Sequence, residues 1–218
     1  MKVSRWKNLL KKLSPTTSIC KICFKDINDI SLFHFVHNNV KICDECFNKF
    51  KVIDKELEIE GVKGEIIYEY DDFFRELLYK YKGCDDYELK DVFLDRRRLL
   101  KYRFKNYTLI NAPSNESEDK RRGYNHVVEM YRCLGLEIIS PIYKNVEFKQ
   151  SDLSSSEREK VSTRLSIKDD VNLNDKKILI VDDVLTTGNT LKAMINLIKT
   201  KNPKSVRFLV MAYHTKNY

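Results

Sequence analysis

The segment that most constrains the fold is residues 178–190, where a short apolar run leads into two aspartates and then a Thr/Gly turn. The apolar run is continuous and follows two lysines, which is typical of a strand buried in a parallel sheet. After the turn, apolar residues recur at helical spacing at Leu191, Met194, Ile195 and Ile198. The segment therefore predicts a buried strand, a tight loop and an amphipathic helix in succession.

Strand and helix patterns also alternate along the rest of the chain. Strands are expected at residues 61–70, 107–112, 136–143 and 206–212, and helices after Asp71 and at 84–104 and 125–134. This alternation predicts an α/β domain with right-handed crossovers and a parallel sheet covered by helices on both faces. Ligands of such sheets bind at the carboxyl ends of the strands, and the Thr/Gly turn lies at such an end.

The turn after Asp183 has the features of an anion-binding site. Its amides and the N-terminus of the following helix converge on one point, and threonine hydroxyls add donors. Asp182 and Asp183 would repel a phosphate bound there, but carboxylates readily accept hydrogen bonds from sugar hydroxyls. We therefore expect a sugar phosphate, with its phosphate on residues 186–190 and its hydroxyls facing the aspartates. The alternative is an ordinary turn with an acidic rim.

The residues from Val181 to Thr190 resemble the phosphoribosyl pyrophosphate (PRPP) loop of type I phosphoribosyltransferases. The resemblance implies that Asp182 and Asp183 bind the ribose 2′ and 3′ hydroxyls. It also implies that the 5′-phosphate is bound by Thr186, Thr187, Gly188, Asn189 and Thr190. The segment contains neither the G-x-x-x-x-G-K-[ST] of a P-loop nor the G-x-G-x-x-G of a dinucleotide-binding fold, so those sites are excluded.

Two C-x-x-C pairs near the N-terminus have a separation typical of a four-thiolate zinc site. They are Cys20, Cys23, Cys43 and Cys46. Zinc would tie together two turns of a segment too short to build its own core. Disulfides or buried free thiols are the alternative, but no secretory signal precedes the pairs, so we expect a reducing compartment. His34 and His37 lie between the pairs and could each replace a cysteine.

The chain has 218 residues and a formal net charge of +8. This excess favours a polyanionic partner such as nucleic acid, or it reflects only a solubilising surface. Residues 1–14 carry five cations and no acid, at a spacing that suits either a short basic helix or a disordered terminus. No apolar run approaches the length of a membrane span, so we expect a soluble, cytoplasmic protein without a transmembrane segment.

A second basic cluster is interleaved with aromatic and apolar residues. It consists of Arg96, Arg97, Arg98, Lys101 and Arg103. Alternating cations and rings suit single-stranded nucleic acid, because cations follow the phosphates while rings stack on bases. The alternative is an amphipathic helix whose apolar face belongs to the core.

Three further segments extend the resemblance to the competence protein F (ComF/ComFC) family. Residues 121–125, Arg-Arg-Gly-Tyr-Asn, resemble its Arg-Gly-Phe-Asn motif, and residues 150–158 resemble its Gln-x-x-Leu-Ser and Glu-Arg loop. The two cysteine pairs match its N-terminal zinc module. The chain differs from the family at residues 111–113, which are Asn-Ala-Pro instead of Pro-Val-Pro, and at His126, where the family has Gln.

The family resemblance implies a type I phosphoribosyltransferase-like parallel sheet flanked by helices, with a small N-terminal zinc-binding module. We expect a basic segment at 1–14, the zinc module at 15–60 and the phosphoribosyltransferase-like domain at 61–218. It also implies Mg²⁺ as the companion of PRPP. Arg121 and Arg122 are candidates for the pyrophosphate side and Arg158 for a closing lid; the alternative for each is a solvated surface cation.

The same resemblance implies a role in natural transformation, with a DNA-translocating helicase as partner when single-stranded DNA enters the cytoplasm. Two functions follow. The first is a binding protein that uses PRPP or a related ribose phosphate and assists DNA uptake. The second is an active phosphoribosyltransferase on an unidentified acceptor. No segment has the features of a base-recognition hood, and we assign no catalytic residue.

Overall fold

The computed structural model describes residues 18–27, 40–144 and 165–214 of the chain. These belong to two compact units, Met1–Lys49 and Phe50–Tyr218. Outside the described residues lie the basic segment 1–14, His34 and His37, and the loop at 150–158 with the expected lid residue Arg158.

The described residues of the first unit, 18–27 and 40–49, include the short strands β1 and β2 and the short helix α3. Strand β1 (Ser18–Ile19) pairs antiparallel with β2 (Asp26–Ile27), so that Ser18 lies opposite Ile27. Helix α3 (Asp44–Phe47) follows Cys43, which occupies its N-cap position. These described elements are all short, and Cys20, Cys43 and Cys46 are among the buried residues of this unit.

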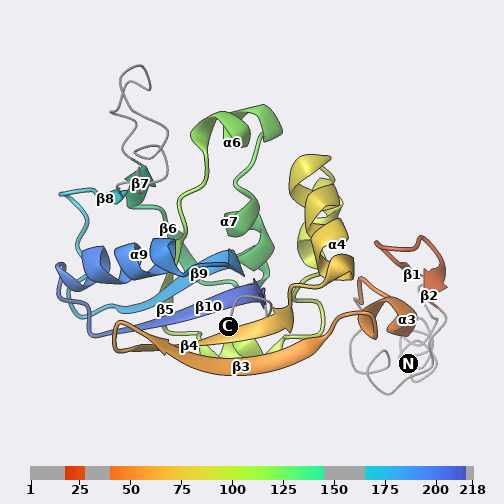
Figure 1. The fold of residues 1–218 in the computed structure, drawn as a ribbon, viewed down its shortest axis with the longest axis horizontal. Helices are drawn as coiled ribbons and strands as arrows, with labels where there is room; N and C mark the ends of the chain where they lie inside the picture. Colours follow the sequence, from red (N-terminus) through yellow and green to blue (C-terminus); the bar gives the residue numbers. More distant parts are fainter. Residues whose placement is uncertain (1–17, 28–39, 145–164, 215–218) are drawn as a thin grey trace, which may run out of the picture. The chain divides into compact units, whose positions relative to one another are not determined.

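The second unit is built on a sheet with the strand order β3-β4-β10-β9-β5-β6 (Figure 1). The strands are β3 (Val52–Ile59), β4 (Val62–Glu69), β5 (Tyr107–Asn111), β6 (Glu137–Ile139), β9 (Lys177–Leu185) and β10 (Ser205–Tyr213). All neighbouring strands run parallel except the edge pair β3 and β4. The expected parallel sheet is therefore confirmed, with one antiparallel strand added at its edge. A separate antiparallel pair is formed by β7 (Ile142–Lys144) and β8 (Leu165–Ile167).

The edge strand β3 lies within the stretch expected to close the zinc module. The compact first unit ends at Lys49, whereas the sequence placed the boundary at residue 60. Residues 56–59 alternate charged and apolar side chains because one face of the edge strand is solvated. Leu57 and Ile59 supply its apolar face and pack against the core of the second unit.

Among the described residues of the second unit, α4 and α9 are the longer helices and the other helical elements are short. These elements are α4 (Asp72–Gly83), the 3₁₀ helix η1 (Tyr87–Asp91), α5 (Leu99–Arg103), α6 (Glu116–Arg122), α7 (His126–Tyr131), the 3₁₀ helix η2 (Arg132–Leu134) and α9 (Asn189–Lys199). The N-cap expected for α4 is present, since Asp71 accepts a hydrogen bond from Phe74 N at 2.9 Å.

The single helix expected at 84–104 is wrong. The structure has η1 and α5 there, joined by turns. Val92, Phe93 and Leu94 are consecutive and all buried, which one face of a regular helix cannot achieve. The backbone at Phe93 is instead held from the sheet, because its carbonyl accepts a hydrogen bond from the Tyr68 hydroxyl at 2.8 Å.

Strand β9 lies inside the sheet and contributes side chains to both of its faces. Ile178 and Ile180 belong to the buried cluster that includes the apolar face of α9. Leu179 and Val181 are also fully buried and, by strand alternation, point to the opposite face. On that face the Tyr131 hydroxyl of α7 lies 2.9 Å from Asp182 O and 3.0 Å from Leu209 O. This double coverage explains the uninterrupted apolar run in the sequence.

The parallel strands end together at one edge of the sheet. Asn111 of β5 is paired with Val181, and Tyr213 of β10 with Leu185. The loop after β9 begins at this edge, and Gly188 forms the N-cap of α9 with a φ of 74°. Among the described residues, no helix combines the length and the apolar character needed to cross a bilayer.

Candidate functional site

Two adjacent carboxylates lie near the carboxyl end of β9. Asp182 Oδ1 accepts a hydrogen bond from Asp183 N at 2.9 Å, and Asp183 Oδ1 accepts one from Val184 N at 2.7 Å. Both side chains are therefore fixed against their own strand, and the sheet carries them to its ligand-binding edge.

Asp183 is held between the side chains of a lysine and a histidine from different helices. Its Oδ2 lies 2.7 Å from Lys82 Nζ on α4 and 3.2 Å from His126 Nε2 on α7. Burial alone raises the pKa of Asp183, but His126 and Lys82 outweigh it and bring that pKa well below its usual range. Asp183 is accordingly a fixed negative charge.

Asp182 has the opposite electrostatic character. Burial raises its pKa well above the usual range, and the negative charge of Asp183 raises it further. The pair therefore combines one firm charge with one carboxyl that ionises reluctantly. Such a pair can accept hydrogen bonds from a polyol and can gain charge when a cation or donor arrives.

The aspartates line a pocket of about 470 Å³. Its walls include the cations Lys82, Arg122 and Lys144, the anions Asp182 and Asp183, and the hydroxyls of Ser114 and Thr190. The volume falls in the range of small-molecule sites. Cations and hydrogen-bond acceptors in one cavity suit a ligand that carries both anionic groups and hydroxyls.

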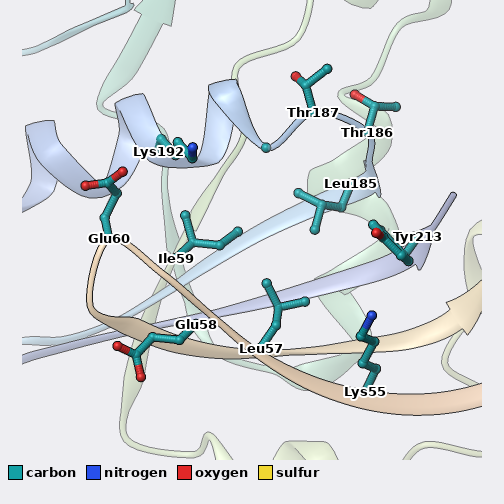
Figure 2. A pocket seen from close by; sticks show the side chains of 11 residues that line it. Lys55, Leu57, Glu58, Ile59, Glu60, Leu185, Thr186, Thr187, Lys192 and Tyr213 are labelled. Carbon is teal, nitrogen blue, oxygen red and sulfur yellow. The ribbon is translucent and has the colours of Figure 1, made fainter. Parts of the chain in front are cut away.

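The loop expected to bind phosphate is divided between two pockets. Thr190 faces the pocket of the aspartates, whereas Thr186, Thr187 and Gly188 line a second pocket of about 440 Å³ (Figure 2). Thr186, Thr187, Asn189 and Thr190 are exposed to solvent. The positive φ of Gly188 strains any side chain placed there, so the turn requires glycine.

The two arginines expected on the pyrophosphate side behave differently. Arg122 lines the pocket of the aspartates, and its side chain is only 5% exposed. Its Nη1 lies 3.0 Å from Asp119 Oδ1, and its Nε donates a hydrogen bond to Lys82 O at 3.1 Å. Arg121 is half exposed and forms a bidentate pair with Asp85, at 2.6 and 3.2 Å. Arg122 can therefore serve the pocket directly, while Arg121 is directed to a surface carboxylate.

The Arg-Gly-Tyr-Asn motif forms the junction of α6 and α7. Gly123 ends α6 with a φ of 82°, and Asn125 caps α7 by accepting a hydrogen bond from Val128 N at 2.9 Å. Asn125 also donates to Ser114 Oγ at 2.7 Å, which joins this junction to the loop after β5. The motif thus positions His126 and Arg122 beside Asp183.

Sequence reasoning missed Lys82 and Lys144. The contact of Lys82 with Asp183 joins residues 101 positions apart, so no local spacing could indicate it. The one available signal was a lysine in the last turn of a well-capped helix, immediately before Gly83. Such a lysine ordinarily complements the helix dipole, which gave no reason to assign it to a site.

The four cysteines of the two C-x-x-C pairs meet in the first unit. Their Sγ atoms all lie within 4.8 Å of one another, and Cys23 Sγ is 3.8 Å from Cys43 Sγ. A tetrahedron of thiolates about 2.3 Å from a central zinc has edges of roughly 3.8 Å, so the cluster has the dimensions of a metal centre. Burial raises the pKa of Cys20, but backbone N–H groups of Cys23 and Cys43 more than offset this and lower it to about 7. The cluster can therefore hold a metal ion that prefers sulfur.

The basic cluster at residues 96–103 is partly committed to the fold. Arg97 Nη1 donates to Asp54 Oδ2 at 3.1 Å, and Arg103 pairs with Glu65. Lys101 and Tyr102 are exposed, and Tyr102 retains 69% of its accessible surface. A cation beside an exposed ring is thus available at Lys101 and Tyr102, whereas Arg97 is paired with β3 and Arg103 with β4.

Known proteins are similar to this chain over the part that contains β9 and the following loop. Residues 134–218 match the family model of the phosphoribosyl transferase domain, which includes β9, the loop and α9. The chain is therefore a phosphoribosyltransferase-like α/β protein. A purine phosphoribosyltransferase from Pyrococcus horikoshii is among the similar solved structures, with 20% sequence identity and a TM-score of 0.35. The match covers 56% of this chain and 73% of that chain. The fold assignment rests on the sheet and on the domain match, not on that superposition.

Curated proteins with similar sequences indicate which kind of phosphoribosyltransferase-like protein this chain resembles. Competence protein ComFC of Streptococcus pneumoniae is 28% identical over 67% of this chain, and ComFC of Bacillus subtilis is 26% identical over 57%. The matches span 66% and 53% of the lengths of those two relatives. The bifunctional protein PyrR of Clostridioides difficile is 28% identical over 47% of this chain and 66% of its own length. With the four-cysteine cluster and the transferase domain, this chain fits the ComFC family of competence proteins.

Proposed function

We propose that this protein binds PRPP or a closely related ribose phosphate at the carboxyl edge of its sheet. The observation that carries the proposal is the Asp182–Asp183 pair in a pocket that also contains Lys82, Arg122 and Lys144. The two carboxylates accept hydrogen bonds from the ribose 2′ and 3′ hydroxyls. The three cations balance part of the charge of a pyrophosphate group.

The 5′-phosphate binds at the loop and the N-terminus of α9. Residues 186–190 are exposed and polar, and α9 has 11 residues, long enough for its N-terminal amides and dipole to favour an anion. Thr190 belongs both to this loop and to the lining of the pocket that contains the aspartates. One ligand can therefore span from the loop to the carboxylates.

Mg²⁺ is the companion ion that this donor set fits. It prefers oxygen ligands, and the two aspartates stand where ribose hydroxyl and pyrophosphate oxygens would meet. When bound, the ion would neutralise pyrophosphate charge that Lys82, Arg122 and Lys144 balance only in part. The protein's own residues hold the ligand, and Arg158 remains a candidate for closing over it.

The four-cysteine cluster holds structural zinc. All four donors are thiols and three are buried, which leaves no open coordination position for a substrate. In this role the ion stabilises the first unit and takes no part in the chemistry of the pocket.

The biological role is to assist uptake of single-stranded DNA in the cytoplasm, together with a helicase-type partner. The support is that both ComFC relatives are named competence proteins. Exposed Tyr102 beside Lys101, near Arg96 and Arg98, offers a ring and a cation of the kind that single strands bind. DNA binding through these residues would weaken steeply with salt.

The test of ligand binding is calorimetric titration of PRPP with Mg²⁺ into the wild type and an Asp182→Asn/Asp183→Asn variant. The matched control is Asp169→Asn/Asp170→Asn, another adjacent pair, whose side chains are exposed. We expect the wild type and the control to bind and the site variant to lose at least tenfold in affinity, because two hydrogen bonds to charged groups are removed. Equal binding by all three proteins would contradict the proposal.

Active phosphoribosyl transfer to an acceptor is the alternative function. The observation that favours it is the match of residues 134–218 to a transferase domain. The reaction breaks the bond between the anomeric carbon and pyrophosphate and forms one from that carbon to the acceptor. Release of pyrophosphate from PRPP that requires both the protein and an acceptor would establish it. PRPP binding without such release would favour the binding function.

A further inference from the structure

The second pocket at the phosphate loop is used by neither the aspartates nor the cations that face them. We call it the hairpin pocket, because strand β3 of the β3–β4 hairpin supplies one of its walls (Figure 2). It is lined from β3 by Lys55, Leu57 and Ile59, and from the opposite side by Leu185, Gly188 and Tyr213. Its volume of about 440 Å³ is in the range of small-molecule sites.

The inner walls of the hairpin pocket are apolar and aromatic. Leu185 and Tyr213 are 6% and 7% exposed, and Leu57 and Ile59 are half-buried. In Figure 2 the Leu57 and Leu185 side chains point into the same space, whereas Thr186 and Thr187 point away from it. The pocket therefore offers hydrophobic contact to a flat ring and leaves the threonine hydroxyls to the other face of the loop.

A single cation stands at the Tyr213 end of this pocket. Lys55 Nζ lies 4.9 Å from the centroid of the Tyr213 ring, and within the described part of the chain it forms no ion pair. At the opposite end, toward the hairpin turn, the lining contains Glu58 and Glu60 together with one cation, Lys192, so the acidic groups are in excess there. An anionic group would therefore be attracted to Lys55 and repelled from the turn.

The hairpin pocket also touches the loop backbone at its most constrained residue. A Cβ atom at Gly188 would lie 3.8 Å from Ile59 Cδ1 and 3.7 Å from Leu185 Cδ1, so both side chains pack on the glycine. The hairpin turn is further tied to α9, because Lys199 Nζ donates to Glu60 O at 2.6 Å. Whatever fills the pocket consequently fixes Leu185 and Ile59 against the loop.

We propose that the hairpin pocket binds a planar aromatic carboxylate, with its ring between Leu57 and Leu185 and its carboxylate on Lys55. Occupation of the pocket holds the loop 186–190 in the conformation that binds phosphate, and so raises the affinity for the ribose phosphate. The second statement rests on the proposed function, whereas the first does not. Because linkage is reciprocal, the ribose phosphate must raise the affinity for the carboxylate by the same factor.

The probes are nicotinate, a planar aromatic carboxylate, and nicotinamide, its neutral amide. Binding is followed by NMR through the side-chain signals of Leu57, Leu185 and Tyr213 in the full chain. We expect nicotinate to shift these signals and nicotinamide to bind about tenfold more weakly, since it lacks the charge that pairs with Lys55. Lys55→Met should reduce nicotinate binding to the level of nicotinamide. Lys63→Met is the matched control, since Lys63 is exposed on β4 outside the pocket.

Absence of binding by nicotinate, or binding that Lys55→Met leaves unchanged, would overturn the assignment of the pocket. For the coupling, PRPP is titrated with and without saturating nicotinate, and we expect affinity for PRPP to rise about fivefold or more. Nicotinate binding with unchanged PRPP affinity would overturn the coupling. If PRPP fails to bind at all while nicotinate still contacts Lys55, the ribose-phosphate proposal fails and the aromatic carboxylate site stands.

Discussion

Asp182 and Asp183 are neighbours on one strand, and the cations around them give the two carboxyls opposite properties. Lys82 and His126 both contact Asp183 Oδ2, so this carboxylate remains charged in spite of its burial. Asp182 is left with the cost of desolvation and with repulsion from Asp183. A ligand that donates hydrogen bonds to the pair, or brings a divalent ion to it, therefore favours ionisation of Asp182. We infer that ligand binding releases a proton from this site.

The opposite pKa directions predict opposite effects of two single substitutions on stability. The pKa of Asp182 is higher in the folded protein than in the unfolded chain. Its contribution to the free energy of unfolding is therefore present at pH values below the unfolded-state pKa and is lost as the pH rises through the folded-state pKa. Asp182→Asn should therefore equal the wild type at acidic pH and exceed it at neutral pH. The pKa of Asp183 is lowered, so Asp183→Asn should cost about 1–3 kcal/mol at neutral pH and progressively less as pH falls.

Urea unfolding of the three proteins between about pH 3 and pH 8, a range that begins below the usual aspartate pKa of about 3.9, measures these differences. Parallel pH profiles for the wild type and Asp182→Asn would show that Asp182 titrates normally in the fold. That result would contradict the electrostatic account of the pair.

The paired arginines of α6 allow a second prediction at the level of single residues. Arg122→Ala removes an almost fully buried guanidinium that bonds to Asp119 and to the carbonyl of Lys82, and should cost about 2–3 kcal/mol. Arg121→Ala removes only an exposed pair with Asp85 and should leave the melting temperature nearly unchanged. Thermal unfolding of the two variants side by side is the measurement. Equal losses would mean that burial does not distinguish them.

Local elements were predictable where their sequence pattern is governed by neighbours along the chain. The succession of β9, loop and α9 follows from an apolar run, a Gly turn and helical spacing, and the structure has it at residues 177–199. The segment 84–104 failed because its apolar residues are buried consecutively, so tertiary packing and not helical periodicity determines its backbone. Lys82 was missed because its partner, Asp183, is distant in sequence.

The loop itself provides a prediction at the scale of the element. Gly188→Ala places a side chain at a φ of 74°, where the added Cβ meets only ordinary contacts, so the backbone conformation accounts for the cost, about 1–2 kcal/mol. Gly135→Ala is the control, with a φ of 65° and similarly open surroundings away from the loop. Both variants should lose similar stability, but only Gly188→Ala should weaken PRPP binding in calorimetry. Equal PRPP affinity in the two variants would remove the loop from the site.

At the scale of the whole molecule, the chain consists of two units stabilised by different means. The second unit buries a core on both faces of its sheet, whereas the described residues of the first unit place short elements around the four thiols. From the sequence we expected the zinc module to extend to residue 60, whereas the compact first unit ends at Lys49. The reason is that β3 is an edge strand with one face in solvent. The sequence of such a strand is hard to distinguish from that of a polar linker when the neighbouring strand is not known.

This division predicts that metal removal affects one unit only. The purified protein should contain about one zinc ion per chain, and Cys23→Ser should lose it together with the ordered NMR signals of residues 18–27 and 40–49. Cys84→Ser, an exposed cysteine outside the cluster, should retain the metal. Metal analysis and PRPP calorimetry on both variants measure this, and PRPP binding should survive in each. Unfolding of the sheet on metal loss would contradict the independence of the two units.

The most direct test of ribose-phosphate binding is a crystal structure of the full chain with PRPP and Mg²⁺. The account predicts the 5′-phosphate on residues 186–190, the ribose hydroxyls within hydrogen-bond distance of Asp182 and Asp183, and the pyrophosphate beside Arg122 and Lys144. Ligand density elsewhere, or an unoccupied pocket at ligand concentrations that saturate binding in solution, would contradict it.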